Sequence, residues 1–152
     1  MNADSFGSYD PMLASAIIKE FEGCSLTAYK CSAGVWTIGY GHTGRDIGQG
    51  DTITESQADD FLREDLESVQ KRLSHYVNRH VTGGQFIALM SLAFNVGVGA
   101  VARSNLLKKF NSGNVTGSAM EFLDFNLVNG QPSKGLTRRR QAEYSLFLGE
   151  VE

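Results

Sequence analysis

A run of closely spaced glycines early in the chain constrains the fold more than any other feature of the sequence. Seven glycines occur from Gly23 to Gly50, among short β-prone pieces such as Leu26–Tyr29 and Val35–Tyr40. This composition is typical of a small antiparallel sheet with tight turns. Apolar residues on both sides of the segment recur at steps of three or four, which is the spacing of an amphipathic helix. We therefore expect an α+β fold, mostly α, in which a small sheet is inserted between helices.

The first helix is predicted to begin at Asp10 and Pro11, which suit its N-cap and its first helical position. Gly23 is a natural C-terminal stop. Glu22 is therefore expected to be the last residue of a short helix. The apolar residues that give this segment its helical spacing are Leu13, Ile17, Ile18 and Phe21.

Two further patterns predict a long connecting helix and a buried helix. Thr54 and Gln57 fit a capping box at the start of an amphipathic segment that continues to about residue 77. The segment QFIALMSLAFNVG, which begins at residue 85, is apolar on nearly every face and indicates a helix that is buried all round. More helices are expected at about 101–111, 116–124 and 136–148.

The length of 152 residues suits a single domain, 1–152, with a substantial core. Within it, the N-terminal helix and the sheet lobe are expected at about 11–53, the connecting helix at 54–80 and a helical lobe at 81–149. A cleft is expected between the two lobes.

The composition argues against several classes of protein and site. No apolar run approaches the roughly 20 residues that span a bilayer. The first residues lack the pattern of a signal peptide, so stable membrane insertion is not expected. The two cysteines, Cys24 and Cys31, do not make a disulfide scaffold, and the three histidines form no metal-binding pattern. We therefore expect neither a metal nor a cofactor.

The net charge of −3 is divided unevenly along the chain. Residues 1–60 hold three basic and nine acidic side chains, whereas residues 61–152 hold eleven basic and eight acidic ones. A cationic C-terminal half would favour a polyanionic partner, and bacterial cell wall qualifies as well as nucleic acid does. An ordinary solvated surface explains the same distribution, so the charge alone selects no partner.

The expected position of Glu22 suggests acid catalysis. The helix macrodipole disfavours a negative charge at a helix C-terminus and so favours a protonated carboxyl there. A carboxyl that keeps its proton near neutral pH can act as a general acid. A surface glutamate beside a glycine would have the same spacing, so position alone leaves both interpretations open.

The segment FEGCSLTAYKCSAGVWTIGYGHT closely resembles the catalytic segment of the phage-type lysozymes, or endolysins. In that family a Glu is followed after eight residues by Asp or Cys, and after five more by Thr; these positions are Glu22, Cys31 and Thr37 here. The motif YGHT follows at Tyr40–Thr43, and AFNVGVG, SNLLKKFN and GLTRRRQAE resemble the later helices of the family. The resemblance covers about residues 11–149 in the right order.

The resemblance implies an inverting hydrolysis of the β-1,4 bond between N-acetylmuramic acid and N-acetylglucosamine in peptidoglycan. Glu22 would protonate the departing glycosidic oxygen. Cys31 would occupy the position from which a water is directed at the other face of the anomeric carbon, and Thr37 would help to hold that water. Inverting enzymes keep the two groups about 6.5–9.5 Å apart to make room for the water.

Cys31 leaves alternatives open, because a thiol is a weak base unless its pKa falls. A covalent glycosyl–thiol intermediate would make the enzyme retaining. A Cys31–His42 pair would suit a thiol hydrolase, which also needs an oxyanion hole and an orienting third residue. A bridge between Cys24 and Cys31 would remove the thiol from the cleft as a redox switch, and two unlinked cysteines are the simpler alternative.

The positions of other site residues follow from the same resemblance. His42 is expected at the base of the cleft, paired with Asp65 of the long helix. One arginine of the stretch 138–140 is expected to reach back to Glu22. Phe94 could instead belong to the core. The residues expected to contact substrate are Thr43, Phe94, Asn95 and Asn105.

The implied partner is peptidoglycan, with no nucleic acid and no stable membrane insertion, and the chain is expected to act as a monomer. The resemblance implies synthesis in the host cytoplasm, dependence on a holin for release, and action on the wall in the periplasm. A scaffold module that holds peptidoglycan without cutting it is the alternative from another functional class. Loss of Glu22 would have indicated such a module, and Glu22 is present.

Overall fold

The computed structural model describes residues 2–149 and has the predicted α+β architecture, mostly α. Its three 3-10 turns lie at Phe6–Ser8, Pro11–Ala14 and Phe122–Asp124. The helices are α1 (Ser15–Glu22), α2 (Glu55–Ser74), α3 (Gly83–Val96), α4 (Val98–Ala102), α5 (Asn105–Asn111), α6 (Val115–Glu121) and α7 (Lys134–Leu148).

The strands form three small antiparallel sheets. The three-stranded sheet has the order β2-β3-β4, and its register places Thr37 opposite both Tyr29 and Thr43. Thr37 therefore occupies the central strand of this sheet. The strands are β1 (Ala3–Asp4), β2 (Ser25–Lys30), β3 (Trp36–Gly39), β4 (His42–Thr43), β5 (Val81–Thr82), β6 (Leu127–Val128) and β7 (Gln131–Pro132).

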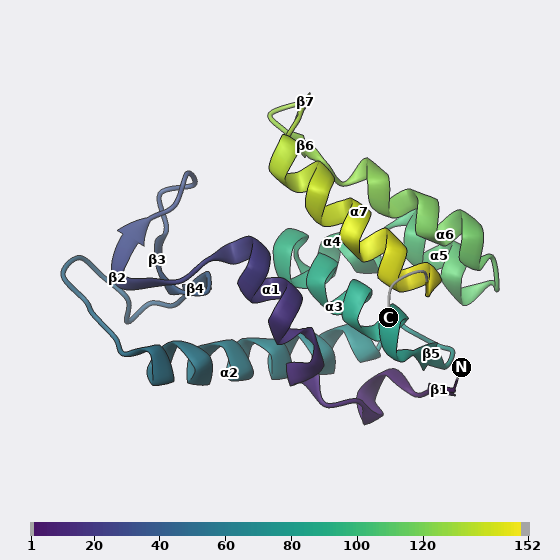
Figure 1. The fold of residues 1–152 in the computed structure, drawn as a ribbon, viewed down its shortest axis with the longest axis horizontal. Helices are drawn as coiled ribbons and strands as arrows, with labels where there is room; N and C mark the ends of the chain where they lie inside the picture. Colours follow the sequence, from purple (N-terminus) through teal and green to yellow (C-terminus); the bar gives the residue numbers. More distant parts are fainter. Residues whose placement is uncertain (1, 150–152) are drawn as a thin grey trace.

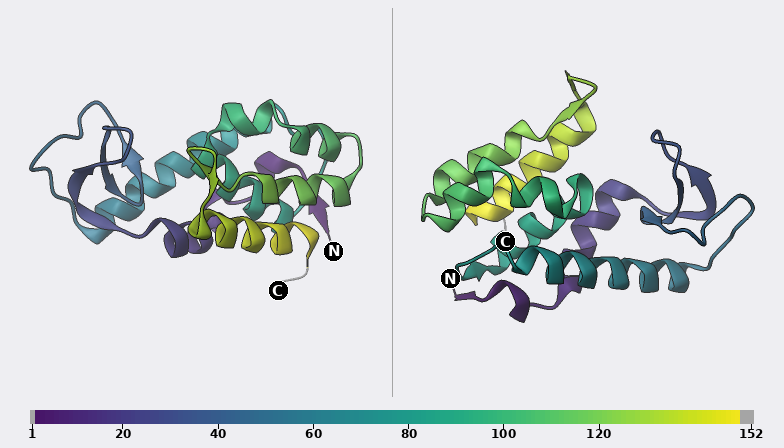
Figure 2. Two further views of the ribbon diagram at one scale, coloured as in Figure 1. Left: turned by 90° about the horizontal axis from the view of Figure 1, so that it is seen from above. Right: turned by 180° about the vertical axis from the view of Figure 1, so that it is seen from behind.

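Helix α2 connects a sheet lobe to a helical lobe. The strands β2–β4 lie at one end of the molecule and the helices α3–α7 at the other, and α2 runs along one side of both (Figure 1). The two further views show the same separation (Figure 2). The predicted capping box starts this helix, since Gln57 N–H donates to Thr54 Oγ1 and Thr54 N–H donates to Gln57 Oε1. Its 20 residues extend about 30 Å at 1.5 Å per residue.

The first helix starts and ends where the sequence predicts, but its first turn differs. Asp10 accepts a hydrogen bond from Met12 N–H, and Gly23 ends the helix with φ +68°. The first turn, Pro11–Ala14, is a 3-10 helix, which has three residues per turn instead of 3.6. This tighter turn buries Ala14 and leaves Leu13 48 % exposed, so Leu13 is not the core residue that its spacing suggested.

The core lies in the helical lobe and includes α1. Helix α3 is buried on nearly every face, as predicted, and its Phe86, Leu89 and Met90 are fully buried. Ile17 and Ile18 of α1 belong to the same core cluster. The helix that ends in Glu22 is therefore anchored against the helical lobe, although its chain continues directly into the sheet lobe.

Two elements in the C-terminal half differ from the expectation. The single helix predicted at 101–111 is two helices, α4 and α5, because Ser104 breaks the first and caps the second by accepting from Leu107 N–H. The segment between the helices expected at 116–124 and 136–148 contains the hairpin β6–β7, whose turn holds Asn129 and Gly130 with φ +52° and +80°. Positive φ at both positions is the geometry of a two-residue hairpin turn.

Within residues 2–149, no helix combines the length and the apolar character that a membrane crossing requires. The same part of the chain contains no group of three or more His, Cys, Asp or Glu side chains placed to hold a metal ion.

Candidate active site

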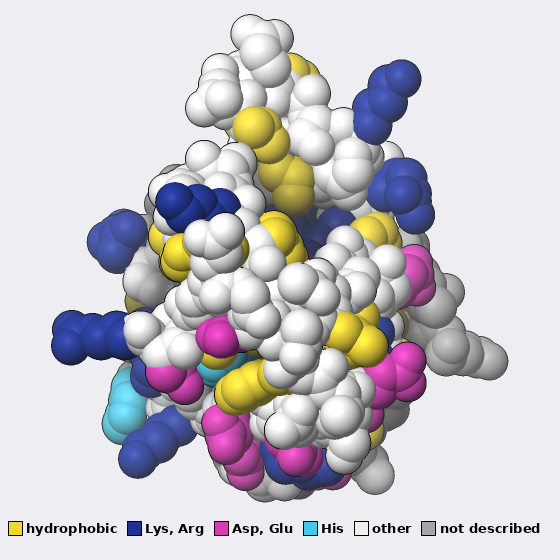
Figure 3. Space-filling model, turned by 90° about the vertical axis from the view of Figure 1, so that its left-hand side faces the viewer, with side chains coloured by type: hydrophobic (Ala, Val, Ile, Leu, Met, Phe, Trp, Pro, Cys, Tyr) yellow, Lys and Arg dark blue, Asp and Glu magenta, His cyan; other side chains and the backbone are white. Residues whose placement is uncertain are grey.

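A hollow of about 240 Å³ between the two lobes brings together most of the predicted site residues. Seen from the end of the sheet lobe, the surface of the molecule is visibly hollowed (Figure 3). Tyr29 and Gly41 line it as well, and sequence reasoning did not single them out. The residues that line it are Glu22, Tyr29, Cys31, Thr37, Gly41, Thr43, Phe94 and Asn95.

Glu22 is the last residue of α1 and is held from the helical lobe by an arginine, as expected. Arg139 Nη1 lies 2.5 Å from Glu22 Oε2. The Arg139 side chain is 4 % exposed and that of Glu22 is 21 % exposed. A nearly buried guanidinium therefore fixes one carboxylate oxygen, while the rest of the side chain borders the hollow.

Arg139 is itself held by a buried polar network between α3 and α7. Its Nη2 and Nε donate to the carbonyl oxygen and the Oγ of Ser91, at 3.2 and 3.3 Å. Ser91 Oγ donates to Glu143 Oε2, and Arg140 Nε lies 2.7 Å from Glu143 Oε1. Burial lowers the pKa of Arg140. Arg139 and Arg140 both contact Glu143, and Arg139 also reaches Glu22. These contacts together hold Arg139 in one orientation.

The backbone of Gly41 makes a close approach to Glu22. Gly41 has φ +88°, and a Cβ placed there would lie 3.3 Å from Glu22 Oε1 and 3.9 Å from Phe94 Cε1. Both features favour glycine, since L side chains rarely adopt this φ and the space is already occupied. Gly41 lies within the motif YGHT, but nothing in the neighbouring sequence indicates that this glycine contacts Glu22.

Cys31 and Thr37 face the hollow from the sheet lobe, around the turn that joins β2 to β3. Cys31 N–H donates to Val35 O at 2.9 Å, and Gly34 N–H donates to Cys31 O at 2.8 Å. Hydrogen bonds from the backbone at Val35 and then Ala33 lower the pKa of the Cys31 thiol. The turn therefore favours the thiolate.

The two cysteines are both free thiols and lie at opposite ends of β2. Cys24 precedes this strand and Cys31 follows it, so seven residue steps separate them. At about 3.3 Å per step in a strand, their Cα atoms are about 23 Å apart. A disulfide needs a Cα separation below about 7 Å. The structure therefore excludes the bridge between Cys24 and Cys31.

His42 makes the expected contact with Asp65 and thereby ties β4 to α2. Its Nδ1 lies 2.9 Å from Asp65 Oδ2, and its ring stacks on Phe61 at a centroid distance of 4.1 Å. Burial raises the pKa of Asp65, and the hydrogen bond with His42 opposes this shift. His42 is not among the residues that line the hollow, which argues against a Cys31–His42 pair.

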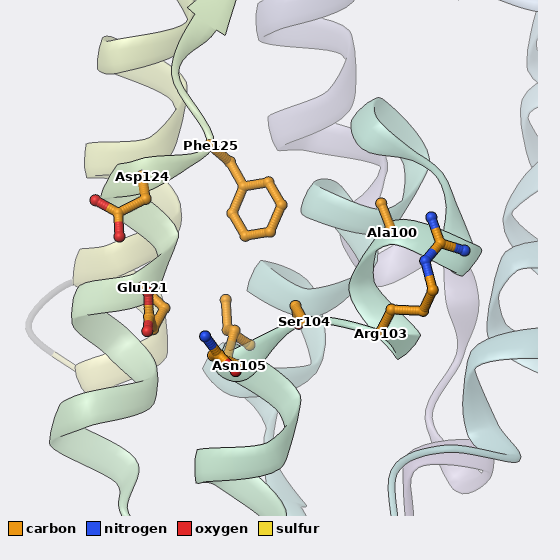
Figure 4. A pocket seen from close by; sticks show the side chains of 8 residues that line it. Ala100, Arg103, Ser104, Asn105, Glu121, Asp124 and Phe125 are labelled. Atoms are coloured by element: carbon orange, nitrogen blue, oxygen red, sulfur yellow. The ribbon is translucent and has the colours of Figure 1, made fainter.

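The predicted substrate residues separate into two groups. Thr43, Phe94 and Asn95 line the hollow with Glu22, and Phe94 also packs against the core. Asn105 lies elsewhere, in a pocket of about 390 Å³ beside Arg103 and Glu121 (Figure 4). Asn105 is the first residue of α5, as expected, and α4 separates it from the end of α3 that carries Phe94 and Asn95.

Comparisons with known proteins agree with this architecture. The phage lysozyme family matches residues 19–143. An endolysin of Acyrthosiphon pisum secondary endosymbiont phage 1 is 46 % identical over 135 residues, which cover 86 % of this chain and 92 % of the relative.

Solved structures give the same result. The muramidase domain of SpmX from Asticaccaulis excentricus has a TM-score of 0.82 and 37 % identity, and the match covers 89 % of this chain and 94 % of that one. The crystal structure of a P22 lysozyme mutant has a TM-score of 0.78 and 36 % identity, with 97 % and 99 % covered. The fold, the two-lobed hollow and these similarities together show that the chain belongs to the phage lysozyme family.

Proposed function

We propose that this protein is an endolysin that hydrolyses the β-1,4 bond between N-acetylmuramic acid and N-acetylglucosamine in bacterial peptidoglycan, with Glu22 as the general acid. The observation that carries the proposal is the placement of Glu22. Its carboxylate is fixed by a buried arginine and borders a hollow that Cys31 and Thr37 line from the sheet lobe. A carboxyl on one side of the bond and a group that positions water on the other is the arrangement of an inverting glycosidase.

The two oxygens of Glu22 have different surroundings, and this assigns the proton. Oε2 accepts from Arg139, whereas Oε1 lies beside Gly41, which lines the hollow. Oε1 is therefore the atom that carries the proton and delivers it to the departing glycosidic oxygen. Because Arg139 is held in turn by Ser91, the carboxyl needs little reorganisation when the bond breaks.

Cys31 and Thr37 would position the attacking water from the sheet lobe, as the Glu-Cys-Thr variant of the family motif implies. The lowered pKa of the Cys31 thiol supports this role, since a thiolate accepts hydrogen bonds and can take a proton from water. The Thr37 hydroxyl donates to Val35 O at 3.0 Å, which leaves its oxygen free to accept a hydrogen bond from the same water. Attack on the face opposite the leaving group inverts the anomeric configuration.

The lining residues beyond these suit an N-acetylated sugar. The half-buried ring of Phe94 offers an apolar surface to a sugar ring, and the amide of Asn95 can hydrogen-bond an acetamido group. The hydroxyl of Thr43 lies at the edge of the sheet lobe in the same hollow. We assign these three residues to substrate binding.

The domain organisation and cellular route are part of the same proposal. The N-terminal helix and the sheet lobe (about 11–53), the connecting helix (54–80) and the helical lobe (81–149) would work as one lysozyme domain, because the hollow takes residues from both lobes. We assign the chain a monomeric state, synthesis in the host cytoplasm and release by a separate holin to the wall in the periplasm. Sedimentation of the purified protein tests the monomeric state directly.

The substitution Glu22→Gln tests the function, with Glu20→Gln as the matched control on the same helix. Gln keeps the shape of the side chain, and its amide oxygen can still accept a hydrogen bond from Arg139, but it has no acidic proton to transfer. Loss of a general acid costs about 10²–10⁴-fold in rate, so a turbidity assay on purified peptidoglycan should show at least this loss for Glu22→Gln. Glu20→Gln should lyse like the wild type. Normal lysis by a folded Glu22→Gln protein would overturn the mechanism, and binding without lysis by the wild type would indicate a scaffold module.

A further inference from the structure

Two more hollows adjoin the one beside Glu22 and continue it along α2. A hollow of about 200 Å³ shares Gly41, Thr43 and Phe94 with the first and adds Arg72 from α2. A third hollow, of about 230 Å³, has Arg72 in common with the second and reaches Tyr76. The three hollows therefore meet in sequence, and Arg72 lies at the boundary of the last two.

The residues that α2 contributes to this path lie on one face of the helix. Positions 65, 69, 72 and 76 follow one another at steps of three or four, and position 68 lies four residues before 72. This spacing places them on one side of α2 and of the turn that follows its end at Ser74. At 1.5 Å per residue, this row is about 16 Å long. Such a path is longer than a single sugar ring, so it can hold a stretch of polymer that continues beyond the bond at Glu22.

We propose that this face of α2 is a distal subsite for the peptidoglycan strand, with Tyr76 against a sugar ring and Arg72 against a carboxylate of the peptide attached to muramic acid. The proposal rests on the proposed function, because it assigns a substrate to a path that begins at Glu22. The ligand of this subsite would be an amphipathic, anionic polymer of glycan and peptide.

Tyr76 supplies the kind of surface that carbohydrates bind. Its side chain is 51 % exposed, just beyond the end of α2, and lines the third hollow with Val98. A large aromatic ring that is held by a helix end and left half in solvent offers a flat apolar face and a hydroxyl at once. Because a sugar ring has apolar C–H faces and polar edges, it complements both parts of the tyrosine.

Arg72 supplies an unneutralised positive charge at the middle of the path. It has no ion-pair partner among residues 2–149. The one carboxylate that lines these two hollows in that part of the chain, Asp65, is paired with His42. A planar guanidinium binds a carboxylate through two parallel hydrogen bonds. A stem-peptide carboxylate is therefore a better partner for Arg72 than any group the protein itself provides.

The test compares Arg72→Ala and Tyr76→Ala with Lys71→Ala. Lys71 lies in the same last turn of α2, so it has the same effect on the helix dipole, but it lines none of the three hollows. Each variant is assayed on intact peptidoglycan and on a purified peptide-free tetrasaccharide, which spans the cleaved bond but lacks both the stem-peptide carboxylate and the longer glycan that the subsite would bind. Both KM and kcat are measured, and circular dichroism confirms folding.

On intact peptidoglycan, Arg72→Ala and Tyr76→Ala should raise KM by about ten-fold with kcat unchanged, the effect of losing about one charge-assisted hydrogen bond or one stacked ring. On the tetrasaccharide they should match the wild type, and Lys71→Ala should match it on both substrates. If wild type cleaves both substrates and the two variants have the KM of Lys71→Ala, the subsite is refuted while the function stands. If wild type cleaves neither substrate, it is the proposed function that fails.

Discussion

The substitution Gly41→Ala tests whether the close approach of this backbone positions Glu22. Two effects are expected from the added methyl group. The first is strain, because Gly41 has φ +88°, a conformation that costs an L residue about 1–2 kcal/mol. The second is a contact, because the new Cβ would lie 3.3 Å from Glu22 Oε1.

The contact is closer than carbon and oxygen normally approach, so the carboxyl must move by a few tenths of an ångström. It cannot do so freely, because Arg139 holds its other oxygen at 2.5 Å. A displacement of about 1 Å can cost about 10²-fold in rate. We therefore expect Gly41→Ala to lower the lysis rate by about ten-fold, a loss that strain alone would not produce.

Gly50→Ala is the matched control for this effect. Gly50 has nearly the same φ, +87°, but a Cβ there would meet nothing within 4 Å. Urea denaturation should show both variants less stable by about 1–2 kcal/mol, with unchanged m values. The turbidity assay on peptidoglycan should then separate them, with Gly50→Ala close to the wild type. Equal activity of the two variants would refute the positioning of Glu22 by Gly41.

Three further predictions concern the site and the core. Cys31→Asp should remain active and Cys31→Ala should be strongly impaired, because an acceptor of the water proton is needed; a sugar adduct on Cys31 in mass spectrometry would contradict the water-positioning role. Because the pKa of Cys31 is lowered, a larger fraction of this residue stays as thiolate when the pH falls. Its alkylation by iodoacetamide should therefore persist to lower pH than the alkylation of free cysteine. If both show the same pH profile, the hydrogen bonds from the turn do not lower the pKa of Cys31. Phe86→Ala should lower the free energy of unfolding by about 3–5 kcal/mol, measured by urea denaturation, because it opens a cavity in the core. The ring of Phe86 is fully buried, with its centroid 4.9 Å from those of Phe6 and Tyr9. A decrease below about 1 kcal/mol would contradict this packing.

Local structure could be predicted from the sequence, because the interactions that determine it act between residues close together in the chain. The cap at Asp10, the stop at Gly23 and the capping box of Thr54 and Gln57 each involve groups within four residues. The helix end at Glu22 and the small sheet follow from them. The family motif added the residues that would share a cleft, and the structure brings six of its seven predicted catalytic and substrate residues into one hollow.

The tertiary structure decided the contacts between distant segments. The sequence offered three consecutive arginines, and the packing of α7 against α3 selects Arg139 for Glu22 while it buries Arg140 against Glu143. Asn105 begins α5, as the sequence predicts, but it lines a different pocket from Glu22, and the apolar spacing of 101–111 does not reveal that Ser104 divides this segment into two helices.

One physical reason explains why the sequence predicted the local structure but not the contacts between distant segments. Hydrogen bonds within a turn or a cap depend on local backbone geometry, which a short stretch of sequence specifies. The environment of Glu22 depends on which buried groups neutralise one another across three helices, and a spacing pattern contains no information about that choice. The sequence by itself therefore determined where Glu22 stands in its helix, and only the packing of α1, α3 and α7 decided what holds its carboxylate.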